Sequence, residues 1–246
     1  MRAPAILLSL LSTLLIAEAH AETRVALVLG IRDYKTMAPR PNAAGDAHAI
    51  ADLLKSAGFE VIEARDVSRE QFGARLDDFA NKADTADIAL FYYAGQSIAL
   101  SGMNYLLPAD ASVKSEMDVK LGAALPLAKV IDGAMGHAKT KIVLFDASRI
   151  NPFGRNNVAM GQMAATGQTL IAMAADPGQG GEGGPNGGHS PFTQALLENI
   201  ATPGVEIHQA MTKVRARVFE LTEKRQLPSG ADNLLSAVYI GSAPAK

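Results

Sequence analysis

The length, composition and charge of the chain exclude several classes of protein. Its 246 residues allow one or two domains, and 48% hydrophobic against 20% charged residues is typical of a folded globular protein. A net charge of −2 gives no basis for a nucleic-acid partner. The absence of cysteine excludes disulfides, lipid-modified cysteine anchors, thiolate metal sites and thiol catalysis.

The N-terminal segment, residues 1–21, has the pattern of a secretory signal peptide. Arg2 precedes an apolar run over residues 5–17, which is short for a membrane span, and Ala19-His20-Ala21 fits the small-x-small cleavage pattern. The alternative is an uncleaved anchor. We expect a single mature domain over residues 22–246, secreted into the periplasm if the source is a Gram-negative bacterium, with no membrane association after cleavage.

Strand-like and helix-like segments alternate through the rest of the chain. Apolar runs and alternation predict strands over residues 24–30, 59–64, 86–93, 141–145, 168–174 and 237–240. Residues 98–107 predict a hairpin that turns at Ser101-Gly102. Helical periodicity predicts helices over residues 46–57, 68–81, 125–138 and 207–225, and Ser190-Pro191 predicts the start of another. Ser68 and Gln71 have the spacing of a capping box.

This order indicates an α/β domain of three layers. Repeated strand–helix–strand units predict a mainly parallel sheet of about six strands with helices on both faces. Ligands on such sheets bind at the carboxyl ends of the strands. The glycine-rich stretch over residues 178–188 is predicted to be a loop between two parts of the domain. It contains G-x-G-x-x-G, but the next helix begins only near Ser190, which argues against a dinucleotide site.

Three motifs follow predicted strands. The strand over residues 25–30 is followed by Asp33-Tyr34, and Asn42 and Asp46 open the next helix. Residues 91–97 read FYYAGQS and are followed by NYLLP at 104–108, and residues 144–152 read LFDASRINP. Together the motifs resemble the caspase-like peptidases of bacteria, the metacaspase and orthocaspase type of the peptidase C14 catalytic domain. The resemblance covers about residues 24–240 and implies a caspase-like sandwich fold.

The resemblance implies a cysteine peptidase in which both catalytic residues are replaced. The second motif of the family normally reads YYAGHG, with the histidine as catalytic base, and the third reads DACRDNP, with the cysteine as nucleophile. This chain has Gln96 at the histidine position and Ser148 at the cysteine position. Ser97 and Ile150 replace a glycine and an aspartate. We therefore expect a degenerate member of the family.

The two replacements remove the chemistry of the site. A glutamine amide is not a base at neutral pH, and a serine hydroxyl needs an adjacent base to become a nucleophile. Both Gln96 and Ser148 are therefore predicted to be non-functional in catalysis, although backbone N–H groups at Gly95 and Ser148 remain as oxyanion donors. A recruited His189 is the alternative base. The sequence shows no metal-ligand spacing and implies no cofactor.

The resemblance also implies that a binding pocket remains. In metacaspase-type members the pocket for the residue before the cut is acidic and takes Arg or Lys, and the matching carboxylates here are Asp46 and Asp146. Both stand at the carboxyl ends of predicted strands, where they can converge. The alternatives are that Asp46 is an acid at a helix N-terminus and that Asp146 accepts hydrogen bonds from local backbone N–H groups.

Three functions remain open on these residues. The first is an exported pseudopeptidase that binds a peptide or protein partner through the acidic pocket without cutting it. The second is a hydrolase that uses Ser148 in a rewired site, and the third is a structural interaction domain whose pocket is vestigial. We favour the first because the replacements at Gln96 and Ser148 occur together inside intact fold motifs. An inactive site also predicts an intact single chain.

Overall fold

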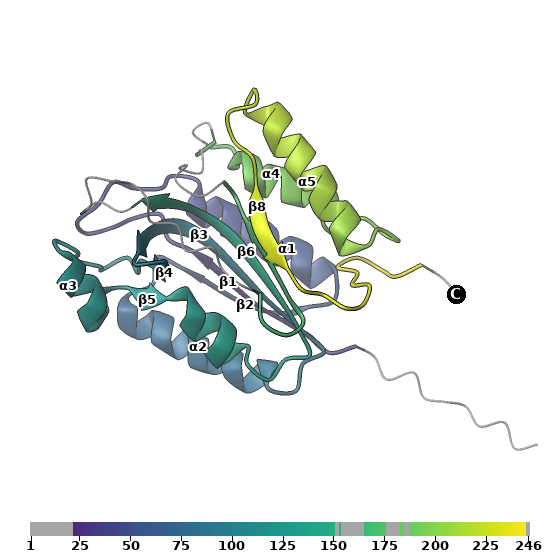
Figure 1. Ribbon diagram of the computed structural model, residues 1–246, viewed down its shortest axis with the longest axis horizontal. Coiled ribbons are helices and arrows are strands. Elements are labelled where there is room, and N and C mark those ends of the chain that lie inside the picture. The colour runs from purple at the N-terminus through teal and green to yellow at the C-terminus, as the bar shows by residue number, and fades with distance from the viewer. Residues whose placement is uncertain (1–21, 151–152, 154–164, 176–182, 185–186, 245–246) are drawn as a thin grey trace, which may run out of the picture.

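The computed structural model of the protein describes residues 22–150, 153, 165–175, 183–184 and 187–244 (Figure 1). The predicted signal peptide, residues 1–21, lies outside these residues, as does most of the predicted glycine-rich loop. None of the helices within the described residues combines the length and the apolar content that a membrane crossing requires.

A sheet of eight strands forms the middle of the domain. Its strands are β1 (Arg24–Gly30), β2 (Glu60–Arg65), β3 (Ile88–Leu100), β4 (Met103–Leu106), β5 (Leu125–Pro126), β6 (Thr140–Ile150), β7 (Thr169–Met173) and β8 (Ser229–Asp232). Six of them follow the order β2-β1-β3-β6-β7-β8, and β4 and β5 lie off this path. The pairs from β2 to β7 are parallel, whereas β8 is antiparallel to β7. The predicted sheet of about six mainly parallel strands is thus confirmed.

Helices cover the sheet, and several begin at the residues that the sequence predicts. They are α1 (Ala43–Ser56), α2 (Arg69–Ala83), α3 (Glu116–Asp118), α4 (Pro191–Asn199) and α5 (Ile207–Leu221), with π-helical segments η1 (Val119–Ala123) and η2 (Lys129–Ala134). The capping box before α2 is present, because the Ser68 hydroxyl accepts from Gln71 N–H and the Gln71 side chain accepts from Ser68 N–H. Before α4, the Ser190 hydroxyl accepts from Thr193 N–H at 3.0 Å.

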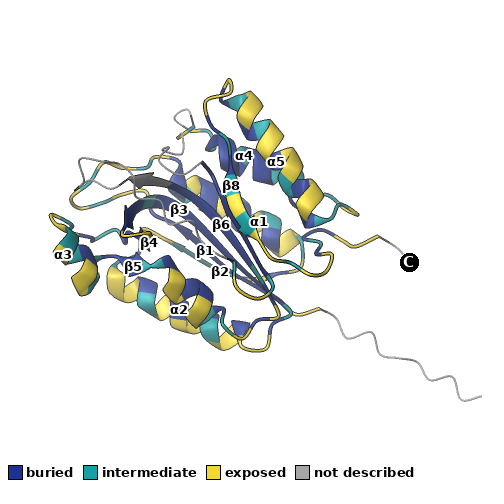
Figure 2. Ribbon diagram, in the orientation of Figure 1, coloured by how far each residue is buried: buried dark blue, intermediate teal, exposed yellow. Residues whose placement is uncertain are grey.

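Two apolar layers lie on opposite faces of the sheet (Figure 2). One packs α1, α4 and α5 against strand residues such as Val28 and Tyr92, and the other packs α2 and η2 against residues such as Leu29 and Tyr93. Successive side chains of a strand point to opposite faces, so a strand buried on both faces reads as a continuous apolar run. This explains why β1 and β3 show no polar alternation, and it confirms the three-layer sandwich.

The long strand β3 continues past the main sheet into a hairpin with β4. Ser101 and Gly102 form the turn, both with positive φ angles of 50° and 80°, as a two-residue hairpin turn of this handedness requires. A third apolar cluster, which includes Ile98, Tyr105 and Val119, packs under the hairpin. The predicted hairpin and its turn are confirmed.

Two predicted elements differ from the structure. The helix expected over residues 125–138 is formed in part: residues 127–134 are helical, mostly as the π-helical segment η2, and Val130 and Ile131 pack below the sheet. Residues 125–126 instead form the short strand β5, because Leu125 pairs with Leu106 of β4. The strand expected over residues 237–240 is not formed, and the last strand is instead β8, whose residues 229–232 pair with β7. Val238 and Ile240 are buried in the layer of α5, so their apolar character reflects helix packing. The last helix also ends at Leu221 rather than at residue 225.

The close approach of β1 and α1 makes a prediction for stability. A Cβ atom at Gly30 would lie 2.3 Å from the carbonyl oxygen of Ala43 and 2.7 Å from Cβ of Ala47. We expect Gly30→Ala to lower the free energy of unfolding by roughly 1–3 kcal/mol, because an added methyl group forces the strand and the helix apart. Chemical denaturation with urea measures this difference.

Gly73→Ala provides the matched control. Gly73 lies inside α2 and an added Cβ would meet nothing within 4 Å, so this variant should gain roughly 0.5–1 kcal/mol from the helix preference of alanine. Equal stability of Gly30→Ala and the wild type would contradict the spacing of β1 and α1.

Candidate ligand-binding site

A cavity of about 90 Å³ lies where β1 ends beside β3 and β6. Residues 39–43, from the loop after β1 to the first residue of α1, form one wall, and Ala94 and Gly95 of β3 form another. Asp46 of α1 and Asp146 of β6 both line it, together with Ser190. The structure thus brings the two carboxylates named from the sequence into one pocket.

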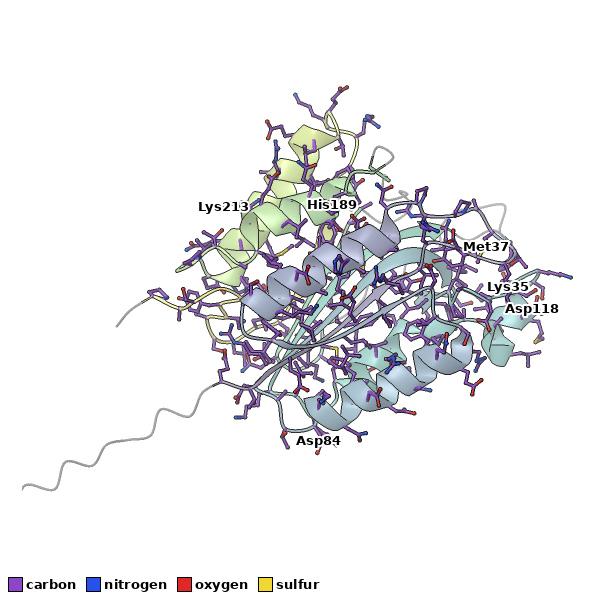
Figure 3. All side chains as sticks on the ribbon, turned by 180° about the vertical axis from the view of Figure 1, so that it is seen from behind. Lys35, Met37, Asp84, Asp118, His189 and Lys213 are labelled. Carbon is purple, nitrogen blue, oxygen red and sulfur yellow. The ribbon has the colours of Figure 1, made fainter. Side chains whose placement is uncertain are left out.

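Asp46 lies in the first turn of α1 and is buried. Its Oδ1 atom lies 2.7 Å from Nδ1 of His189, whose place beside the helices is seen in Figure 3, and its carboxylate accepts from Ser190 N–H. Burial, followed by the negative charge of Asp146, raises the pKa of Asp46 to about 7, although the bonds from His189 and Ser190 act against this increase. Near neutral pH this carboxyl group therefore exchanges between its neutral and charged forms.

Asp146 is only 2% exposed, and its two carboxylate oxygens differ. The Ser190 hydroxyl donates to Oδ2, and the Thr193 hydroxyl donates to the same atom at 2.8 Å. Oδ1 has no hydrogen-bond partner among the described residues. Burial raises the pKa of Asp146, while Ser190, the charge of Arg40 and Thr193 lower it. One buried acceptor atom at the pocket is thus left without the hydrogen bond that such atoms normally have.

A chain of hydroxyl groups connects Asp146 to the core of the sheet. The hydroxyl of Tyr92, which is fully buried, lies 2.6 Å from the Thr193 hydroxyl. Because the single Thr193 hydroxyl proton is given to Asp146, Tyr92 donates to Thr193. Ser190, the N-cap of α4, and Thr193 of α4 are far from Asp146 in sequence, and the sequence offers no signal for their contacts with it beyond the predicted cap at Ser190.

Gln96 is tied to the loop that forms the pocket wall. Its side-chain Nε2 donates to the Ala38 carbonyl at 3.2 Å, and its backbone N–H donates to the Tyr34 hydroxyl at 2.6 Å. The Tyr93 hydroxyl donates to the Gln96 carbonyl at 2.7 Å. In the parallel pairing of β3 and β6, Gln96 stands opposite Ser148, so the two replaced positions are neighbours in the sheet. The side chain of Ser148 lies outside the described residues.

Gly95, proposed from the sequence as an oxyanion donor, pairs with Ala147 in the same ladder. A Cβ atom at Gly95 would lie 2.6 Å from the Tyr34 hydroxyl and 2.7 Å from the Tyr93 hydroxyl. Glycine is therefore the residue that lets these two phenols approach the strand. In the sequence, Tyr34 and Tyr93 stand out only as parts of the motifs, and no local pattern predicts this contact.

The loop after β1 adds a positive charge that the sequence analysis missed. Arg40 lines the pocket and lowers the pKa of Asp146 through its charge. At the other side, Asn42 donates through Nδ2 to the Gly188 carbonyl, which ties the start of α1 to the end of the glycine-rich stretch. Within the described residues, no group of three or more His, Asp or Glu side chains is arranged to hold a metal ion.

Comparison with solved structures matches the fold to caspases. Caspase-1 from Spodoptera frugiperda superposes with a TM-score of 0.63 at 16% identity, covering 92% of each chain. The Drosophila initiator caspase Dronc superposes with a TM-score of 0.62 at 17% identity, covering 89% of this chain and 84% of that one. Because the identity is so low, these matches establish a shared fold and nothing beyond it.

Comparison of sequences points to the same group. The human mucosa-associated lymphoid tissue lymphoma translocation protein 1 is 26% identical over 91 residues, which are 37% of this chain and 11% of that protein. The sequence model of the caspase domain of peptidase C14 matches residues 23–239, nearly the whole described domain. The chain therefore belongs to the caspase domain family, peptidase C14.

Proposed function

We propose that the protein is an exported pseudopeptidase of the caspase fold, which binds a peptide or protein partner in the pocket of Asp46 and Asp146 without cleaving it. The observation that carries this proposal is Oδ1 of Asp146, a buried acceptor atom of a pocket-lining residue, which has no hydrogen-bond partner among the described residues. Leaving such an atom unpaired costs roughly 1–3 kcal/mol. A ligand that donates a hydrogen bond to it would recover that free energy.

The charge of the pocket favours a cationic ligand. Asp46 and Asp146 both line the pocket. Ser190 donates hydrogen bonds to both carboxyl groups, from its N–H to Asp46 and from its hydroxyl to Asp146, but both of these donors are neutral. An arginine or lysine side chain would bring both N–H donors and a positive charge, and one charged hydrogen bond is worth roughly 1.5–3 kcal/mol. We therefore propose that the group recognised on the partner is an arginine or lysine side chain.

The residues at the catalytic positions of the family support the absence of cleavage. The chain contains no cysteine to supply a thiolate. The Gln96 amide has no basic nitrogen and already donates its N–H to the Ala38 carbonyl. Gln96, which replaces the catalytic histidine, thus holds the loop at Ala38 and cannot accept a proton from a nucleophile.

One contact favours a second candidate, hydrolysis with Ser148 as nucleophile. Nδ1 of His189 lies 2.7 Å from Oδ1 of Asp46, and a carboxylate on Nδ1 is what orients the catalytic histidine of serine hydrolases, leaving Nε2 as the base. A structural domain with a vestigial pocket is the third candidate, which predicts neither binding nor cleavage.

Binding of a charged peptide tests the proposal directly. The probe is a short fluorescent peptide with one arginine, compared with the same peptide carrying the neutral isostere citrulline. We expect the arginine peptide to bind the full chain at least about tenfold more tightly, the scale of one charged hydrogen bond. Asp146→Asn should lose that preference. Fluorescence anisotropy measures both affinities.

The control for this experiment is Asp84→Asn. Asp84 is an exposed acid at the end of α2, and it lies well away from His189 in Figure 3. This variant should bind as the wild type does. Equal affinity for the two peptides would leave the vestigial pocket as the better account.

A hydrolysis assay separates the pseudopeptidase from the hydrolase, with the same peptide sequence as substrate. We expect no release of a fluorophore placed after arginine or lysine above the level of Ser148→Ala, because neither a thiolate nor a histidine stands at the family's catalytic positions. An arginine-specific peptidase run in parallel verifies the substrate. Release that Ser148→Ala and His189→Ala both abolish would establish the hydrolase instead.

The Asp46 carboxyl group predicts how stability depends on pH. The pKa of Asp46 is about 7 in the folded protein, whereas the ordinary value is 3.8. Between pH 3.8 and pH 7 the folded protein therefore keeps a proton on this carboxyl group that the unfolded chain has released. The stabilisation is complete below pH 3.8 and is lost as the pH rises through 7, by at most about 1.4 kcal/mol per pH unit. Urea denaturation from pH 5 to 8 should show this fall for the wild type and a flatter profile for Asp46→Asn. Parallel profiles would contradict the shifted pKa.

A further inference from the structure

Arg40 is the cation that the chain itself brings to the acidic pocket. It stands in the pocket wall, residues 39–43, facing the cavity that Asp46 and Asp146 also line. Burial raises the pKa of Asp146 and that of Tyr92, whose hydroxyl connects to Asp146 through Thr193, and the charge of Arg40 acts against both increases. Arg40 therefore acts electrostatically on the same carboxylate that is proposed to receive a ligand.

The backbone of the pocket wall is held in place. Arg40 N–H donates to the Arg32 carbonyl at 2.8 Å, and the Arg40 carbonyl accepts from Ala43 N–H at 3.0 Å. The flanking residues Pro39 and Pro41 have a fixed φ angle, and a proline also restricts the residue before it. The backbone of Arg40 is thus restrained from both sides, while its long side chain keeps several rotatable bonds.

The space that remains is small. A cavity of about 90 Å³ holds a few water molecules, whereas pockets that bury a ligand usually measure roughly 300–1,000 Å³. A second cation placed beside Arg40 would also be repelled by its like charge. The small free volume and the like charge of Arg40 both favour withdrawal of the Arg40 side chain when an arginine or lysine side chain enters.

We propose that Arg40 is a tethered occupant of the acidic pocket, which balances the charge of Asp146 in the free protein and turns outward when a cationic side chain of a partner enters. This inference rests on the proposed function, because it concerns the same pocket and the same class of ligand. Since the tethered group is always present at high effective concentration, it weakens the binding of every cationic ligand. It thereby selects partners that make further contacts outside the pocket.

The variant that tests this inference is Arg40→Gln, which removes the charge and keeps much of the side-chain length. We expect the fluorescent arginine peptide to bind Arg40→Gln roughly tenfold more tightly than the wild type, since the like charge that repels a cationic ligand beside the two carboxylates is removed. Arg40→Lys, which keeps the positive charge, should bind at a strength between the two. The citrulline peptide should gain much less, because it never competed for a cation site.

The matched control is Arg32→Gln. Arg32 belongs to the same loop, but its side chain is exposed and pairs with Asp33. The loss of this charge should change the affinity by less than about twofold, on the scale of an exposed ion pair. A comparable gain in Arg32→Gln and Arg40→Gln would mean that general charge, and not occupation of the pocket, controls binding.

The possible outcomes distinguish this inference from the function on which it rests. If the wild type binds the arginine peptide and Arg40→Gln binds it equally or more weakly, only the tethered occupant is overturned. If neither protein prefers the arginine peptide over the citrulline peptide, the cationic pocket itself is overturned. Thermal unfolding of each variant identifies a loss of folding, and Arg40→Lys then decides the question.

Discussion

The burial of two carboxylates, Asp46 and Asp146, is the constraint on which the site depends. A carboxylate removed from water costs several kcal/mol unless hydrogen bonds or opposite charges compensate. The compensation comes from segments distant in the chain: Ser190 reaches both acids, Thr193 reaches Asp146, and the charge of Arg40 acts on Asp146. The position of α4 over the sheet is therefore linked to the protonation of the pocket.

The parallel pairing of β3 and β6 carries this site and divides the roles of neighbouring residues. Side-chain alternation places Tyr92 in the layer of α4 and Tyr93 in the layer of α2. The hydroxyl of Tyr92 ends in the Thr193 contact, whereas that of Tyr93 donates to the Gln96 carbonyl. Tyr92 and Tyr93, which the sequence assigns to the core, thus also hold the Thr193 hydroxyl and the Gln96 backbone in position.

Local signals in the sequence were reliable where the physics was local. The capping box of Ser68 and Gln71 and the turn at Ser101-Gly102 depend on residues within four positions of one another, and both are confirmed. The start of the helix predicted over residues 125–138 and the strand predicted over residues 237–240 were misassigned, because Leu125 pairs with β4 and Val238 and Ile240 pack in the layer of α5. The strand β8 contains Gly230, whose missing side chain lets it lie against the Ile171 carbonyl, and it pairs only because β7 offers it an edge.

The sequence by itself determined the family, the parallel sheet and the absence of a thiol nucleophile, because strand-end motifs, apolar runs and composition are properties of the chain order. The resemblance to metacaspase-type peptidases pointed to Asp46 and Asp146, and their places near the carboxyl ends of strands predicted that the two would converge. Only the tertiary structure decided that Oδ1 of Asp146 is left without a partner among the described residues, that His189 contacts Asp46 and that Arg40 lines the same cavity. Those relations depend on distances between segments up to about 150 residues apart, as in the 143-residue separation of Asp46 and His189, and no local pattern encodes them.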